Sequence, residues 1–157
     1  MKKLLFTILM ILTFVGIGQV KTLEELKKII SSDTFERVCI ENGYEPYDQF
    51  RKEVILYGVD PLPDPNNLGN YKSSANYWLN QTPNENINYG RKWNFNFKED
   101  HIVYFDEIFN NAKKECKYVD ISKFGKVTFV TYDCLPNGKL GFAKEGGRSY
   151  ISFIKYN

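Results

Sequence analysis

Aromatic side chains interleaved with amides are the strongest candidates for binding chemistry in this sequence. Phe, Tyr and Trp make up 16% of the 157 residues, and four rings lie among asparagines in the middle of the chain: Tyr71, Tyr77, Trp78 and Tyr89. Flat rings beside amides are typical of surfaces that bind sugars or proteins, although rings also fill hydrophobic cores. Adjacent strand residues point to opposite faces, so Tyr77 and Trp78 cannot both face the core.

Groups that could carry out catalysis are few. His101 is the only histidine and lies beside Glu99 and Asp100 at the start of a predicted helix, where we expect it to be solvated. Cys39 as nucleophile with His101 as base is disfavoured, because Cys39 lies on an apolar helix stripe rather than at a helix N-terminus that would lower its pKa. A hydrolytic pair of carboxylates needs only to meet in space, but no particular pair is indicated.

Motifs for metals and phosphates are missing from the sequence. The chain has no Cys-x-x-Cys pair, no His-x-x-x-His pair and no EF-hand loop. An Asp- and Asn-rich turn at 60–67 could offer oxygens to calcium, but such composition more often serves only to form a turn. The late glycines belong to predicted hairpin turns and not to a phosphate loop. We therefore predict no metal and no cofactor.

The first 18 residues have the features of an export signal. Lys2 and Lys3 precede an uncharged, mainly apolar run that is too short to span a bilayer, and Gly16 and Gly18 suit signal peptidase. We expect cleavage before Gln19 and a periplasmic or extracellular protein without stable membrane insertion. A retained anchor or a buried core helix is the alternative.

Charge argues against a nucleic-acid partner. The chain has 21 Lys and Arg against 19 Asp and Glu, and loss of the two signal-peptide lysines would balance them. Nucleic-acid binders usually gather a basic excess on one face, whereas here the two signs are mixed along the chain. The partners that remain are proteins and glycans.

An exported chain meets an oxidising compartment, in which cysteines can pair. Cys116 extends the apolar stripe of a predicted helix that begins at Asp100, and Cys134 ends a predicted strand that this helix must cover. We expect these two cysteines to form a disulfide. Cys39 is expected to remain a buried thiol.

Residue periodicity predicts a single α+β domain over residues 19–157. Helical spacing runs from Leu23 to Asn42 with N-caps at Thr22 and Asp33, and again after Asp100. Alternating patterns and turn signals predict six strands, which lie at 53–59, 74–80, 89–98, 126–134, 139–144 and 149–156. On the strand at 89–98, Trp93, Phe95 and Phe97 should face the core. The last three strands should form an antiparallel meander.

The order of elements suggests an internal duplication. Residues 22–98 and 100–157 each contain helical sequence followed by three strands, and each half ends on a strand with alternate aromatics before a lysine. Two tandem αβββ units, each with an antiparallel sheet covered by a helix, would explain this order. Recurrence of turn residues by chance is the alternative.

The Lys-Lys-Leu-Leu start, the Gly-Gln cleavage region and the late Tyr-Asp-Cys strand followed by Gly-Phe-Ala-Lys resemble small exported proteins of the Bacteroidota. The resemblance implies a periplasmic or extracellular location and no particular activity. Our first functional hypothesis is therefore an exported, non-enzymatic binding module for a protein or an envelope component. The alternatives are a carbohydrate-binding module that uses the rings near Tyr77 and Trp78, and a hydrolase with an unrecognised carboxylate pair.

Overall fold

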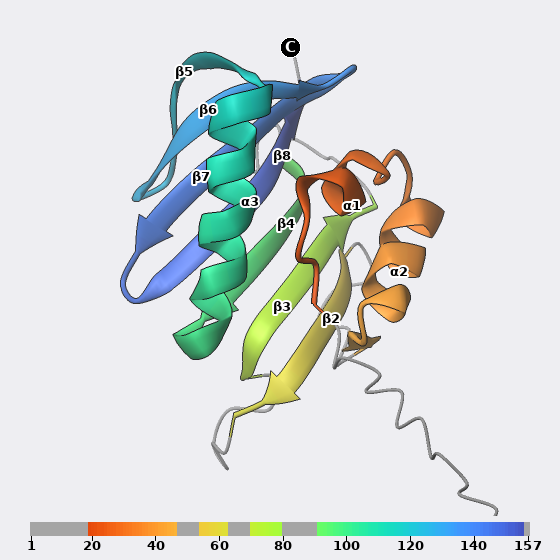
Figure 1. Ribbon diagram of the computed structural model, residues 1–157. Helices are drawn as coiled ribbons and strands as arrows, with labels where there is room; N and C mark the ends of the chain where they lie inside the picture. The colour runs from red at the N-terminus through yellow and green to blue at the C-terminus, as the bar shows by residue number, and fades with distance from the viewer. Residues whose placement is uncertain (1–18, 47–53, 63–69, 80–90, 156–157) are drawn as a thin grey trace, which may run out of the picture.

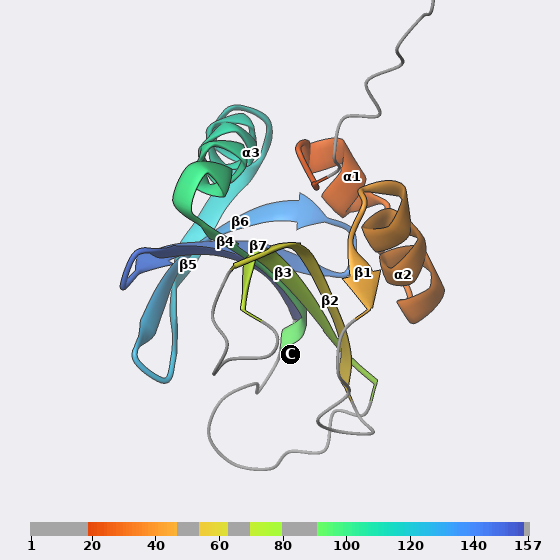
Figure 2. The ribbon, with the colours of Figure 1, turned by 90° about the horizontal axis from the view of Figure 1, so that it is seen from below.

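The computed structural model describes residues 19–46, 54–62, 70–79 and 91–155, to which all structural statements below refer. One eight-stranded antiparallel sheet has the order β1-β2-β3-β4-β8-β7-β6-β5. Its strands are β1 (Glu45–Pro46), β2 (Val54–Pro61), β3 (Tyr71–Trp78), β4 (Arg91–Lys98), β5 (Lys117–Phe124), β6 (Val127–Leu135), β7 (Gly138–Glu145) and β8 (Arg148–Lys155). The helices are α1 (Leu23–Lys27), α2 (Ser32–Glu41) and α3 (Ile102–Glu115), with a 3-10 turn η1 (Glu99–His101) before α3. Figures 1 and 2 show all three α-helices on one side of this sheet, so the protein is of the α+β class.

Side-chain caps start the first two helices. Thr22 caps α1 in a capping box, as the sequence predicts. Ser31 caps α2, so the prediction of Asp33 as its N-cap is wrong. Asp100 does not cap α3 either, because the turn η1 carries the chain directly into that helix.

Strand β4 supplies the centre of the hydrophobic core. Trp93, Phe95 and Phe97 are at most 1% exposed, whereas the residues between them are partly exposed. The Phe95 ring centre lies 5.7 Å from that of Phe35 in α2, and the Phe97 ring centre lies 6.4 Å from that of Phe105 in α3. The predicted alternation is confirmed, and the core lies between the sheet and the helices.

Two strands were missed by the sequence analysis. One is the two-residue β1, and the other is β5, which lies where we expected only a connection from α3 to β6. A tight turn joins β5 to β6, and Gly125 there has a φ of 61°, which glycine adopts without strain. The second half therefore has four strands, of which β6, β7 and β8 form the predicted meander.

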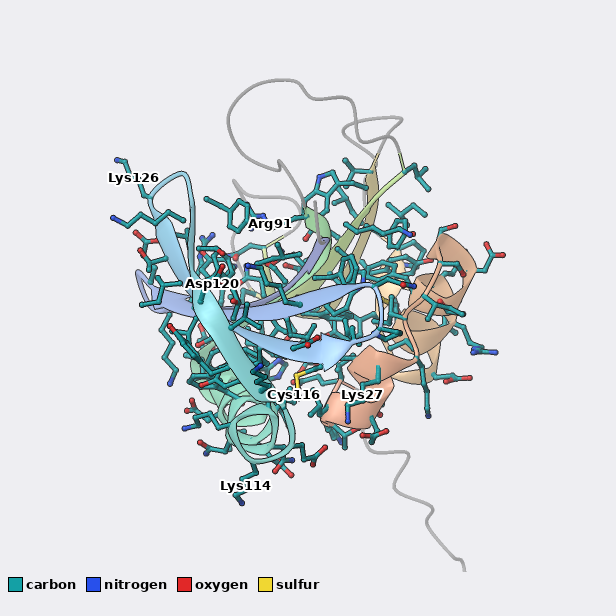
Figure 3. All side chains as sticks on the ribbon, turned by 90° about the horizontal axis from the view of Figure 1, so that it is seen from above. Lys27, Arg91, Lys114, Cys116, Asp120 and Lys126 are labelled. Carbon is teal, nitrogen blue, oxygen red and sulfur yellow. A yellow bond between two sulfur atoms is a disulfide. The ribbon has the colours of Figure 1, made fainter. Side chains whose placement is uncertain are left out.

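The face of the sheet turned away from the helices carries a smaller cluster. The Arg91 guanidinium lies 5.2 Å from the ring centre of Phe124 and 5.4 Å from that of Phe129. Figure 3 shows Arg91 on the opposite side of the sheet from α1 and α3. Burial lowers the pKa of this guanidinium, yet an arginine stays charged at neutral pH.

Cys116 and Cys134 form the predicted disulfide, with Cα atoms 5.1 Å apart. The bond, drawn in yellow in Figure 3, joins the end of α3 to β6. Cys39 is free and buried on α2, and burial raises the pKa of its thiol. A thiol in that environment is a small apolar side chain and not a nucleophile.

The described residues test the membrane prediction only in part, and they do not include the predicted export signal. No helix in the part of the chain that the structure describes is long and apolar enough to cross a bilayer. Residues 1–18 lie outside the described ranges. Gln19, the expected first residue of the mature chain, is 3% exposed.

Candidate functional site

A pocket of about 710 Å3 opens where β3 ends and β4 begins. This volume falls within the range of small-molecule sites, about 300–1,000 Å3. The described residues that line it come from the strands β3, β4, β6 and β8, the β6–β7 turn, α1, the link from α1 to α2 and the residue after β3: Lys27, Ile29, Ile30, Tyr77, Trp78, Leu79, Lys92, Trp93, Leu135, Pro136, Asn137 and Phe153. Segments far apart in the sequence thus build one site.

Three neighbouring strands form the aromatic wall of the pocket. Tyr77 of β3 pairs in register with Trp93 of β4, which pairs with Phe153 of β8. The rings of Trp93 and Phe153 stack with centres 5.9 Å apart and planes at 28°. All three side chains are at most 8% exposed, so core packing holds the wall in place before any ligand arrives.

Exposed apolar side chains stand at the rim of the pocket. Ile30, in the link from α1 to α2, is 72% exposed, and Leu79, directly after β3, is 47% exposed. Trp78 is partly exposed and lines the same pocket. Large apolar groups gathered on a surface are typical of interaction sites, because a ligand that covers them removes apolar area from water.

Two lysines among the described residues line the pocket, and they differ in their partners. Lys27, labelled on α1 in Figure 3, pairs with Glu24 at 2.6 Å and with Glu115 of α3 at 3.2 Å. The pKa of Lys27 is raised, first by its hydrogen bond to Glu24. Lys92 lies at a register shift between β4 and β8 and has no partner residue on β8. Its ammonium is 5.7 Å from the ring centre of Tyr77, within cation–π range.

The predicted binding residues are not all brought together. Tyr77 and Trp78 both line the pocket. Tyr71 lies at the opposite end of β3, where its ring covers Gly58 so closely that a Cβ on this glycine would be 2.4 Å from the ring atom Cγ. Tyr89 lies outside the described residues. The structure thus places two of the four at one site and one elsewhere.

Several pocket residues were not singled out from the sequence. Ile30 had no local signal, because Ile29 and Ile30 continue one helical apolar stripe in the sequence, whereas α1 ends at Lys27 and leaves Ile30 72% exposed. Leu79 directly follows the two candidate rings of β3. Lys92 and Phe153 had no local signal, because their place at the pocket depends on how β4 pairs with β8.

His101 is buried at 4% exposure, so the expectation of a solvated histidine is wrong. Its Nδ1 lies 3.0 Å from the Ser73 hydroxyl, and its Nε2 lies 3.1 Å from a carboxylate oxygen of Asp60 and 2.7 Å from the side-chain amide of Gln19. The residue before Asp100, Glu99, has a φ of 52°. This left-handed residue changes the direction of the chain just before His101, which a local sequence pattern does not reveal.

Ser73, His101 and Asp60 have the composition of a hydrolase triad but not its accessibility. Ser73 is fully buried, so its hydroxyl is out of reach of a substrate. Desolvation lowers the pKa of His101 and outweighs the attraction of Asp100 and Asp60, which leaves the ring neutral at pH 7. The cluster instead ties the N-terminal segment and η1 to β2 and β3.

A second polar cluster joins β5, β6 and β7. The Lys139 ammonium donates to both carboxylate oxygens of Asp120, at 2.7 and 2.8 Å, and the Thr131 hydroxyl donates to the same carboxylate. The hydrogen bond from Lys139 is the main cause of the lowered pKa of Asp120. Ser122 lies 3.3 Å from this ammonium and donates a hydrogen bond to the same carboxylate, so the cluster holds β5, β6 and β7 together.

No Asp or Glu among the described residues lines the pocket. Within the same ranges, no group of three or more His, Cys, Asp or Glu residues is placed to hold a metal ion. Comparison with known proteins finds no family model that matches the chain, no similar curated protein and no similar solved structure. Function must therefore be argued from the pocket itself.

Proposed function

We propose that the protein is an exported, non-enzymatic binding module that takes an apolar group of an envelope component or a protein into the pocket beside Tyr77 and Trp78. One observation carries the proposal: a preformed aromatic wall is joined to exposed apolar side chains at its rim, Ile30 and Leu79. Sites for organic ligands are concave and mainly apolar, with few polar groups. The described part of the pocket lining has this composition.

The disulfide supports the exported location. Structural disulfides persist outside the reducing cytoplasm, and Cys116 is bonded to Cys134. Gln19 is buried and its amide contacts His101, so the residue that follows the proposed cleavage point is packed into the domain. A periplasmic or extracellular protein cleaved before Gln19 is consistent with both observations.

We also propose that residues 22–98 and 100–157 arose by duplication. The last strand of each half, β4 or β8, lies at the middle of the sheet, and the two pair antiparallel. Phe97 pairs with Ser149, while Phe153 pairs with Trp93, four residues earlier than Phe97. Any antiparallel pair of strands has a local two-fold axis, and the axis between β4 and β8 relates Phe97 to Phe153, as a duplication would require. The extra helix of the first half and the long β5 of the second would be later differences.

Glycan binding is a second candidate because Trp78 is partly exposed and lines the pocket together with the amide of Asn137. Sugars stack on open ring faces and bond to amides. The burial of Tyr77 and Trp93 favours an apolar ligand instead. Titration with soluble neutral oligosaccharides distinguishes the two candidates, because only glycan binding predicts saturation with them.

A neutral apolar dye, Nile red, tests the proposal. The protein should bind it with energy transfer from Trp78 and Trp93, the only two tryptophans. Trp78→Ala should weaken binding about tenfold, since loss of some 50 Å2 of ring contact removes about 1.3 kcal/mol. Tyr118→Ala is the matched control, because this ring is 52% exposed and lies on β5 outside the pocket. Equal weakening by both variants, or no binding at all, would contradict the proposed pocket function.

A further inference from the structure

The charges at the pocket indicate the class of its ligand, and this inference rests on the proposed function. Lys27 and Lys92 are the only charged side chains among the described residues that line the pocket. The rest of that lining is apolar or aromatic, apart from the amide of Asn137 and the phenol of Tyr77. A ligand that fits must therefore present a mainly apolar body.

Lys27 is already neutralised. Its ammonium lies 2.6 Å from Glu24 and 3.2 Å from Glu115. The ion pair with Glu24 lies within α1, and the ion pair with Glu115 joins α1 to α3. Lys27 therefore helps to fix the position of α1 at one side of the pocket. Because its charge is balanced by these carboxylates, Lys27 attracts an anionic ligand only weakly.

Lys92 is not neutralised in this way. None of the ion pairs formed by the described residues includes it. Its ammonium lies near the Tyr77 ring, on the same pocket as the stacked rings of Trp93 and Phe153. An ammonium beside apolar walls is complementary to a carboxylate whose apolar chain lies along those walls.

We propose that the pocket binds an amphipathic organic anion, in which an alkyl chain lies against the aromatic wall and a terminal carboxylate meets Lys92. The volume of about 710 Å3 accommodates such a molecule. The exposed rim residue Ile30 covers the part of the chain nearest the opening. The lack of acidic lining among the described residues disfavours a cationic amphiphile.

Calorimetric titration of the purified protein with decanoate, 1-decanol and decyltrimethylammonium tests the charge preference. Decanoate should bind about tenfold more tightly than the alcohol, since a hydrogen bond to a charged group adds discrimination of that order. The cation should bind most weakly. Lys92→Gln should remove the difference between decanoate and decanol.

Two isoleucines provide a matched pair of variants that need not disturb the core. Ile30→Glu places a carboxylate at the rim and should weaken decanoate binding while it strengthens binding of the cation. Ile40→Glu makes the same change on α2, where Ile40 is 59% exposed and does not line the pocket, and should change neither. Equal affinity for decanoate and decanol, or preference for the cation, would overturn the anion proposal but leave a pocket for apolar groups. Failure of all three probes together with Nile red would overturn the proposed function as well.

Discussion

Truncation of Phe95 to alanine tests the register on which both the core and the pocket depend. Phe95 is fully buried, and its ring centre lies 5.6 Å from that of Trp93, 5.7 Å from Phe35 and 5.9 Å from Tyr44. Removal of a buried Phe costs about 3–5 kcal/mol. Three lost ring pairs, each worth about 0.5–1.5 kcal/mol beyond area burial, place the expected loss toward the upper end of that range.

Urea unfolding followed by circular dichroism measures this loss. With a slope of about 2 kcal/mol per molar urea, a loss of about 5 kcal/mol lowers the midpoint by about 2.5 M. Tyr118→Ala, which truncates a half-exposed ring on the edge strand β5, should shift it far less. An unchanged midpoint in Phe95→Ala would refute the assignment of Phe95 to the core face.

Three further predictions concern the rest of the fold. The free energy of unfolding should fall as the pH drops below 6.5, because the unfolded chain then binds a proton at His101, whereas the lowered pKa of His101 keeps the folded protein from binding it. His101→Gln should remove this dependence between pH 7.5 and 5.5. A slope that persists in the variant would exclude His101 as its source. Replacement of Cys116 and Cys134 by alanine should lower the free energy of unfolding by about 3 kcal/mol for the 18-residue separation, whereas unchanged urea unfolding would show that the bond does not contribute. Gly58→Ala should lower the free energy of unfolding by about 1–3 kcal/mol, because the added methyl group meets the Tyr71 ring. In a double-mutant cycle, the loss from Gly58→Ala should be smaller when Tyr71→Ala is also present. Additive losses would contradict the contact.

Local patterns were sufficient for much of the fold. Alternating rings on β4 determine which face is buried, and Asn-Gly and Gly-Gly turns determine the β6–β7–β8 meander. The disulfide followed from helix periodicity, because the stripe that carries Cys116 must face the sheet. Each of these predictions depended on residues close together in the chain.

Features that depend on distant segments could not be predicted in the same way. β5 was missed because Lys117, Asp120 and Lys123 dilute its apolar pattern, as is usual for an edge strand exposed to water. His101 looks solvated between acids, yet it is buried by contacts to Ser73 and Gln19, which lie 28 and 82 residues away. The two candidate rings of the pocket were identified, whereas its other walls come from helices and strands that only the tertiary fold brings together.

If the pocket beside Tyr77 and Trp78 is where the protein binds its ligand, the indole N–H signals of its two tryptophans should report the binding. Trp78 and Trp93 both line the pocket, so each signal in a proton–nitrogen correlation spectrum reports on occupancy. Titration with decanoate should shift both signals along one saturation curve, and Lys92→Gln should move that curve to higher decanoate concentration. Two indole signals that stay in place while decanoate binds would show that decanoate binds elsewhere and not in this pocket.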